Sequence, residues 1–324
     1  MQQAHRFAVV ADIGGTNGRF ALANNCNGDI SLSELRQYPS CESTSLFDIV
    51  KRYMASLPQD IEIDGACLAV AGPVTDSGVK ITNLGWHSQL DELELELGFP
   101  RLELMNDFAA YANSVPFLPD YHKVFIKSGT PVVSNSPVLV MGPGTGLGVA
   151  SLVPVKNGWY PVACEGGHIA LAANDELQAQ IISILRKEFG HVSAETVLCG
   201  RGLVTLYRVL AGLRFKPVVH NTPAQITQAA VEGHDPLAVE ALDEFCRWLG
   251  HVSGDIVLAQ GARGGVVLGG GILPRIVDFV GQSKFVEAFL SKGVMTEYLR
   301  NIPVKIAMKS DTALTGAAAW FYRQ

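Results

Sequence analysis

The chain alternates short apolar runs with segments in which apolar residues recur every three or four positions. The runs at 7–11 and 65–71 predict buried strands. Helical spacing of apolar residues over 46–57, and again over 236–260, predicts two amphipathic helices. Strands and helices that alternate at this rhythm are typical of α/β domains, in which the sheet is largely parallel after the opening hairpins.

A glycine turn interrupts the first stretch of apolar residues, FAVVADIGGTNGRFALA at 7–23. Two β-prone runs joined through glycines predict a strand, a turn and a second strand. Glycines bring backbone N–H groups close to a ligand, and such groups with a threonine hydroxyl suit a phosphate. An ordinary hairpin with a surface aspartate fits the same pattern. The candidate phosphate residues are Gly14, Gly15, Thr16 and Asn17, and Asp12 beside them is a candidate Mg²⁺ ligand, directly or through water.

The same arrangement recurs at 137–153, PVLVMGPGTGLGVASLV. Two such hairpins facing each other across a cleft would hold a polyphosphate from both sides, so the pair predicts an ATP site. The candidate residues here are Gly142, Gly144, Thr145 and Gly146. The loop is not a dinucleotide fingerprint, because Leu147 stands where the last glycine is required and a β-prone run follows. No GxxxxGK[ST] motif of a P-loop occurs in the sequence.

A third glycine cluster follows the predicted strand at 264–268. Gly269, Gly270 and Gly271 lie where this strand turns towards a predicted helix. Three glycines at such a turn allow a flat group such as adenine to approach the backbone.

Polar residues follow other predicted strands and turns. Asn106 and Asp107 come directly after a strand; Asp107 suits a helix N-cap and also lies where open α/β sheets bind ligands. Glu165 and His168 flank a Gly-Gly turn, either as solvated surface residues or as a ligand-binding pair. Glu195 follows a predicted helix start, where a carboxylate complements the helix dipole. Both roles stay open for these residues.

Composition narrows the class of protein. A chain of 324 residues predicts two domains. The net charge of −6 and the lack of a long basic run give no support for a nucleic-acid or membrane partner. Six separated cysteines without a CxxC pair indicate reduced thiols rather than disulfides or a zinc site. Neither a signal peptide nor a membrane-spanning run is predicted, so we expect a cytoplasmic protein.

Six segments in order resemble the bacterial glucokinase family of the sugar-kinase, actin and heat-shock-ATPase superfamily. They are DIGGTNGRFALA, MNDFAAYA, GPGTGLGVA, EGGH, GHVSAETVLCGRGL and GGGILPR. The resemblance extends from Asp12 to the last predicted helix. A cysteine-rich zinc motif, which marks the neighbouring repressor-and-kinase sugar family, is absent from the sequence.

The resemblance implies an α/β fold of two ribonuclease-H-like, actin-like ATPase domains with a cleft between them. The smaller would take 1–110 plus 301–324, and the larger 111–300. It implies ATP-dependent phosphorylation of D-glucose at the 6-hydroxyl, which yields glucose 6-phosphate and ADP, the first step of glucose use in glycolysis. It also implies Mg²⁺ and a homodimer.

The resemblance further implies the roles of individual residues. Asn106, Asp107, Glu165, His168 and Glu195 match sugar-contacting positions, and Asp107 matches the catalytic base. The segments 12–17 and 142–148 match the two phosphate loops, and 269–271 matches the adenosine loop. Two departures adjoin the site: Ala163-Cys164 replaces a Pro-Gly, and Cys199-Gly-Arg201 replaces a Ser-Gly-Pro. They affect loop detail and affinity rather than the reaction.

Two alternatives use the same scaffold. One is a kinase of another acceptor, such as mannose, an amino sugar or a small carboxylate; the three carboxylates of the sugar cluster disfavour a carboxylate acceptor. The other is a sugar sensor or transcriptional regulator. We expect no helix-turn-helix ahead of Asp12, which disfavours a regulator.

Overall fold

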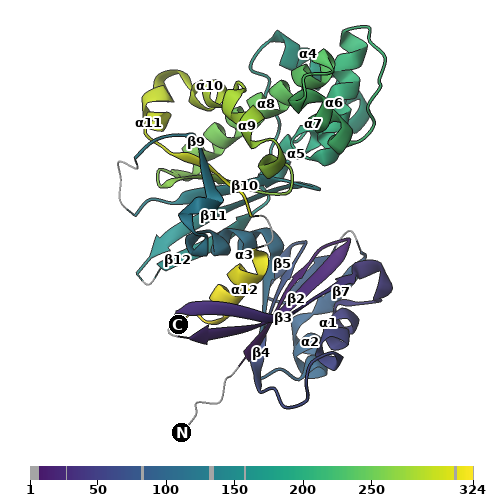
Figure 1. Cartoon of the computed structure of the whole chain (residues 1–324), viewed down its shortest axis with the longest axis vertical. Helices are drawn as coiled ribbons and strands as arrows, with labels where there is room; N and C mark the ends of the chain where they lie inside the picture. Colours follow the sequence, from purple (N-terminus) through teal and green to yellow (C-terminus); the bar gives the residue numbers. More distant parts are fainter. Residues whose placement is uncertain are drawn as a thin grey trace. The chain divides into compact units, whose positions relative to one another are not determined.

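The computed structural model describes residues 7–26, 28–81, 84–130, 135–156, 158–309 and 312–323. The chain forms two compact units, which are considered separately (Figure 1). Unit 1 combines 1–118 with 311–324, and unit 2 is the continuous segment 119–310. In both units a glycine hairpin leads into a sheet, as the sequence predicts.

Unit 1 is built on a five-stranded sheet in the order β3-β2-β1-β4-β8. Strands β1, β4 and β8 are parallel, whereas β1-β2 and β2-β3 are antiparallel. The strands are β1 (Phe7–Ile13), β2 (Asn17–Cys26), β3 (Asp29–Pro39), β4 (Ile63–Val70) and β8 (Leu102–Asn106). A separate three-stranded sheet contains β5 (Val74–Thr75), β6 (Gly78–Ile81) and β7 (Trp86–Gln89).

Helices cover both faces of the unit 1 sheet, because its central strands β1 and β4 carry buried apolar residues on both sides (Figure 1). On one face, Val9 and Ala11 pack with residues of α1 (Leu46–Ala55) and α2 (Leu90–Leu97). On the other, Ala8 and Val10 pack with α3 (Asp107–Ser114) and α12 (Ala313–Phe321). The short 3-10 helices are η1 (Ser40–Glu42) and η2 (Val115–Phe117).

Unit 2 is built on a six-stranded sheet in the order β12-β11-β10-β13-β14-β9. As in unit 1, an antiparallel hairpin adjoins parallel strands, here β10, β13 and β14. The repeated topology confirms the internal duplication that the two glycine hairpins predict. The strands are β9 (Lys123–Lys127), β10 (Val138–Pro143), β11 (Leu147–Val155), β12 (Gly158–Cys164), β13 (Gly265–Leu268) and β14 (Val304–Ala307).

The helices of unit 2 pack on one face of its sheet around α8 (Pro236–Gln260), whose bounds match the sequence prediction. Phe245 and Trp248 of α8 are fully buried, which confirms their role in the core. No helix of the described ranges is long and apolar enough to cross a membrane. The other α-helices are α4 (Glu176–Phe189), α5 (Ala194–Val197), α6 (Gly200–Leu213), α7 (Pro223–Val231), α9 (Val277–Gln282), α10 (Phe285–Leu290) and α11 (Thr296–Arg300). The 3-10 helices are η3 (Asp120–His122), η4 (Gly166–His168), η5 (Leu273–Arg275) and η6 (Gly293–Met295).

Candidate active site

The turn between β1 and β2 contains the first predicted phosphate residues. The N–H of Gly14 donates to the carbonyl of Asn17 (2.9 Å), which closes the turn. No described residue accepts a hydrogen bond from the N–H of Gly15 or of Thr16, and Thr16 is exposed. The turn therefore presents backbone donors to its surroundings, as a phosphate cradle requires.

Asp12 is the second-last residue of β1, two positions before Gly14, and pairs with Arg19 across the hairpin. The Nη1 atom of Arg19 lies 3.9 Å from Oδ2 of Asp12. Burial raises the pKa of Asp12 above its ordinary value, and the Arg19 guanidinium opposes this shift. The carboxylate is thus partly desolvated, and further positive charge nearby would favour its ionised form.

The sheet register places Asp12 and Asp107 at the same edge of unit 1. Across the parallel strands, Asp12 aligns with Ala69 of β4 and Ala69 with Met105 of β8. Asn106 ends β8 and Asp107 begins α3, so both lie at the carboxyl ends of the strands. Two strand spacings separate β1 from β8, about 10 Å. Open α/β sheets bind ligands at this edge.

Asn106, and not Asp107, is the N-cap of α3. Its Oδ1 accepts hydrogen bonds from the N–H groups of Phe108 and Ala109, both at 3.0 Å. The predicted capping role of Asp107 is therefore wrong, because the helix begins one residue earlier than that role requires, at Asp107 itself. Asp107 is the first helical residue, and its Oδ1 accepts from the N–H of Phe108 (2.8 Å).

In unit 2, the second glycine hairpin lies against the third glycine cluster. The N–H of Gly144 donates to the carbonyl of Gly146 (2.8 Å), which closes the turn between β10 and β11. Gly270 has a φ of +79°, and a Cβ atom there would lie 2.4 Å from the carbonyl oxygen of Pro143. Only glycine allows this approach. The two predicted nucleotide loops, 142–146 and 269–271, are thus neighbours.

Glu195 of α5 also contacts the second hairpin. Its Oε2 accepts a hydrogen bond from the N–H of Leu147 (2.7 Å). A Cβ atom on Gly146 would lie only 2.5 Å from the same carboxylate oxygen. Glu195 therefore does more than complement the dipole of α5.

The turn that holds Glu165 and His168 packs against the same strand. A Cβ atom on Gly167 would lie 2.3 Å from the carbonyl oxygen of Leu147, so this turn requires a glycine. His168 Nε2 lies 4.0 Å from Glu165 Oε2, and both side chains are more than half exposed. Leu147, the first residue of β11, thus donates its N–H to Glu195, and the Glu165–His168 turn packs against its carbonyl.

The segment that departs from the family pattern at Cys199 also adjoins the hairpin. The N–H of Gly200 donates to the carbonyl of Gly144 (2.9 Å). Cys199 is buried and caps α6, because its Sγ accepts from the N–H of Gly202 at 3.3 Å. Burial raises the pKa of the Cys199 thiol. The Cys199 sulfur thus caps α6 at the position where the family pattern has a serine hydroxyl.

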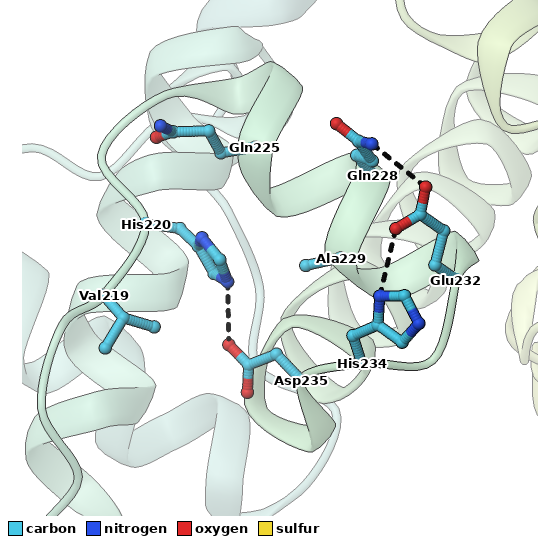
Figure 2. Close-up of a pocket in the computed structure, with 8 residues that line it drawn as sticks. All are labelled: Val219, His220, Gln225, Gln228, Ala229, Glu232, His234 and Asp235. Atoms are coloured by element: carbon cyan, nitrogen blue, oxygen red, sulfur yellow. Dashed lines mark hydrogen bonds and ion pairs between the residues drawn. The ribbon is translucent and has the colours of Figure 1, made fainter.

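A pocket of about 590 Å³ lies beside α7 and contains none of the residues predicted from the sequence (Figure 2). His220 and His234 face it, each paired with a carboxylate: His220 with Asp235 at 3.4 Å and His234 with Glu232 at 3.1 Å. Asp235 also caps α8 through the N–H of Leu237. The remaining lining residues are Val219, Gln225, Gln228 and Ala229.

The structure thus groups the predicted residues by unit. Unit 1 brings together Asp12, the 14–17 turn, Asn106 and Asp107; unit 2 brings together Glu165, His168, Glu195, the 142–146 turn and the 269–271 loop. Within the described ranges, no group of three or more His, Cys, Asp and Glu side chains is arranged to hold a metal ion.

These features define the class of protein. Two units, each with a hairpin-led sheet and a glycine turn at the edge that carries carboxylates, form the actin-like ATPase fold of sugar kinases. A Streptomyces griseus glucokinase of the ROK family, solved with glucose and AMPPNP, shares this fold with a TM-score of 0.65 at 21% identity over 97% of this chain and 98% of that protein.

The chain belongs to the glucokinase family: residues 9–324 match the family model described as Glucokinase. The glucokinase of Saccharophagus degradans is 41% identical over 96% of this chain and 97% of that protein. A solved glucokinase from an Antarctic psychrotroph is 41% identical with a TM-score of 0.86, covering 98% of this chain and 99% of that protein. The activity is ATP-dependent phosphorylation of glucose.

Proposed function

We propose that the chain transfers the γ-phosphoryl group of ATP to the 6-hydroxyl of D-glucose, with Asp107 as the base that accepts the hydroxyl proton. The products are glucose 6-phosphate and ADP. The observation that carries this assignment is the position of Asp107, at the carboxyl edge of the sheet that also ends in Asp12 and the 14–17 turn. Asn106 supplies the helix cap, so the Asp107 carboxylate is not required for that purpose.

Asp107 acts mainly by placing the attacking hydroxyl. The transition state of phosphoryl transfer is loose, so it demands little from a base. A hydrogen bond from the 6-hydroxyl to the carboxylate aligns the hydroxyl oxygen with the γ-phosphorus. The carboxylate takes the proton as the new O–P bond forms and the bond between the γ-phosphorus and ADP breaks.

The glycine turns supply backbone donors for the phosphates. In unit 1 the N–H groups of Gly15 and Thr16 have no described acceptor, which suits them, together with the Thr16 hydroxyl, to phosphate oxygens. In unit 2 the 142–146 turn takes the same role, with the hydroxyl of Thr145. The neighbouring 269–271 loop, with glycine at a positive φ, takes the adenosine.

Asp12 fits a Mg²⁺ ion, because hard cations prefer oxygen ligands and burial leaves this carboxylate short of compensating charge. We propose that Asp12 holds the ion directly or through water. Bound there, the ion would neutralise charge on the phosphate oxygens. Arg19, at 3.9 Å, supplies further positive charge.

The sugar hydroxyls are read by Asn106, Glu165, His168 and Glu195 together with Asp107. Carboxylates, an amide and an imidazole pair with individual hydroxyl groups, and an analogue that lacks one leaves a polar group unpaired. Glucose is therefore the preferred acceptor. The alternative is another hexose or an amino sugar, for which the phosphate loops are unchanged and only these five side chains would differ in their partners.

Two variants of Asp107 test the assignment, with Asp91 as a matched control because it lies in the first turn of α2, another helix of the same unit. We expect Asp107→Ala and Asp107→Asn to lower kcat by about 10²- to 10⁴-fold. Binding of a non-hydrolysable ATP analogue, measured by calorimetry, should change little. Asp91→Asn should retain wild-type turnover. Wild-type kcat in Asp107→Ala would refute the role of Asp107.

A substrate panel tests the acceptor. ADP release is measured with Mg-ATP and glucose, mannose, fructose, N-acetylmannosamine or acetate. We expect strong turnover with glucose alone; a preference for another acceptor would reassign the five sugar-reading side chains.

We further propose that the two units serve as the two domains of the enzyme, whose limits the sequence puts near 110 and 301. A cytoplasmic homodimer is the expected form. Light scattering coupled to gel filtration measures the mass of the particle, and a monomer mass would contradict the dimer.

A further inference from the structure

Ser40 follows β3 as the first residue of η1 and is fully buried. Both of its hydrogen-bond donors, the N–H and the hydroxyl, bond to the glycine turn of unit 1. The N–H donates to the carbonyl of Thr16 (2.9 Å), and Oγ donates to the carbonyl of Gly14 (2.7 Å). One serine, 26 positions from Gly14 in sequence, thus fixes two peptide groups of the predicted phosphate turn.

The geometry of a trans peptide converts this contact into an orientation of donors. The C=O and N–H of one trans peptide group point in opposite directions. Because Ser40 Oγ holds the Gly14 carbonyl, the N–H of Gly15, in the same peptide group, points away from Ser40. No described residue accepts a hydrogen bond from that N–H. Ser40 therefore determines which way the open donor of the turn faces.

We propose that Ser40 is a positioning residue for ATP, whose hydroxyl holds the Gly14–Gly15 peptide so that the Gly15 N–H faces a phosphate oxygen. This inference rests on the proposed function, in which the 14–17 turn binds phosphate. Without the hydroxyl, this peptide group rotates more freely and its donor must be ordered each time the nucleotide binds.

Ser43 offers a matched control in the same segment. It is also buried, and its N–H closes the η1 turn by donating to the Ser40 carbonyl (3.2 Å). Its Oγ has no hydrogen-bond partner among the described residues. Removing this hydroxyl changes the same kind of buried serine without touching the glycine turn.

The experiment compares Ser40→Ala with Ser43→Ala in steady-state kinetics and in calorimetry with a non-hydrolysable ATP analogue. Loss of one buried hydrogen bond should raise the KM for ATP and the analogue Kd about tenfold in Ser40→Ala. The KM for glucose should stay within about twofold, because this turn does not bind the sugar in the proposed function. Ser43→Ala should match the wild type in the KM for ATP, the Kd for the analogue and the KM for glucose. Ser40→Cys keeps the volume and a weak donor and should give an intermediate Kd.

Thr16→Ala separates failure of this inference from failure of the proposed function. If Thr16→Ala weakens ATP binding while Ser40→Ala resembles Ser43→Ala, the positioning role is wrong and the phosphate turn stands. If neither variant changes ATP binding, both are wrong. Equal losses for ATP and glucose in Ser40→Ala would indicate general structural damage and would also refute the positioning role. Thermal denaturation of each variant checks that it is folded. If Ser40→Ala does not fold, Ser40→Cys is compared with Ser43→Ala instead.

Discussion

The carboxylate of Glu195 accepts a hydrogen bond from the backbone N–H of Leu147, with 2.7 Å between Oε2 and N. The residues come from different elements, α5 and the start of β11. One carboxylate oxygen thereby anchors the second glycine hairpin, and Glu195 also belongs to the proposed sugar site. A substitution in the hairpin should consequently change the affinity for glucose.

Gly146→Ala tests this link. Its Cβ atom would lie 2.5 Å from Glu195 Oε2, so the carboxylate must shift and its bond to Leu147 must weaken. We expect glucose binding without nucleotide to weaken about tenfold, as for the loss of a charge-assisted hydrogen bond. Tryptophan fluorescence titration or calorimetry gives the Kd. Gly144→Ala is the matched control, because its Cβ atom would have its nearest neighbour, the nitrogen of Gly271, 4.0 Å away. Equal glucose affinities in the two variants would contradict the link.

Asn106 has two roles that substitution can separate. Asn106→Ala removes the N-cap of α3 and should lower the free energy of unfolding by about 1 kcal/mol. Asn106→Asp keeps an acceptor for the N–H groups of Phe108 and Ala109 but loses the amide donor, which in this structure donates to the carbonyl of Gly72 at 3.3 Å. We therefore expect Asn106→Asp to raise the KM for glucose and to lose less stability than Asn106→Ala, because the cap of α3 is kept. Urea denaturation and steady-state kinetics measure the two effects. A wild-type KM in Asn106→Asp would remove the amide from the sugar site.

Buried His251 of α8 should make unit 2 sensitive to acid. Burial, Lys292 and Arg247 lower its pKa to about 4, while Asp255 and Asp175 oppose the shift. Because the unfolded state, with a pKa near 6.5, binds the proton more readily, stability should fall as the pH drops from about 6.5 towards 4. Below about 4 this contribution should stop changing.

Thermal melts between pH 4.5 and 7.5 test the His251 prediction. His251→Gln should flatten the loss of stability over this window. A wild-type slope in His251→Gln would assign the acid sensitivity to other groups.

Cys199→Ser should stabilise the start of α6. The present cap is a sulfur that accepts from the N–H of Gly202 at 3.3 Å, and a hydroxyl oxygen is a stronger acceptor at this position. We expect the free energy of unfolding to rise by about 0.5 kcal/mol, with kcat unchanged. Urea denaturation gives the stability. A lower stability would show that burial of the thiol contributes more than the cap.

The local features of the fold could be predicted from the sequence because each has a short-range cause. Glycines between two β-prone runs predict the hairpins. Pro236, followed by apolar residues that recur with a period of about 3.6 residues, predicts α8. The N-cap of α3 could not be assigned this way. Asn106 and Asp107 are both good capping residues, and the choice between them follows from the pairing of Val70 with Asn106, which depends on the sheet register.

The contacts within the candidate site depend on tertiary structure. Glu195 and Leu147 meet across 48 positions, and Ser40 and Gly14 across 26. Neither pair shares a period or a motif, so no local pattern marks it. Ser40 also lies in a polar stretch with three other serines or threonines at 43–45, among which sequence alone singles out none.

The close crossing of α12 and α3 has a consequence for biosynthesis. A Cβ atom on Gly316 would lie 1.7 Å from the carbonyl oxygen of Ala110, and Asn113 Nδ2 donates to the Gly316 carbonyl at 2.8 Å. The helix that begins with Asp107 thus takes its packing partner from a segment that the ribosome makes only after all of unit 2. Unit 2 can fold as it emerges, whereas unit 1 must wait with one face of its sheet covered by α3 alone. Asp107 and the 14–17 turn, which we propose for catalysis and phosphate binding, would therefore lie in the last part of a newly made molecule to mature.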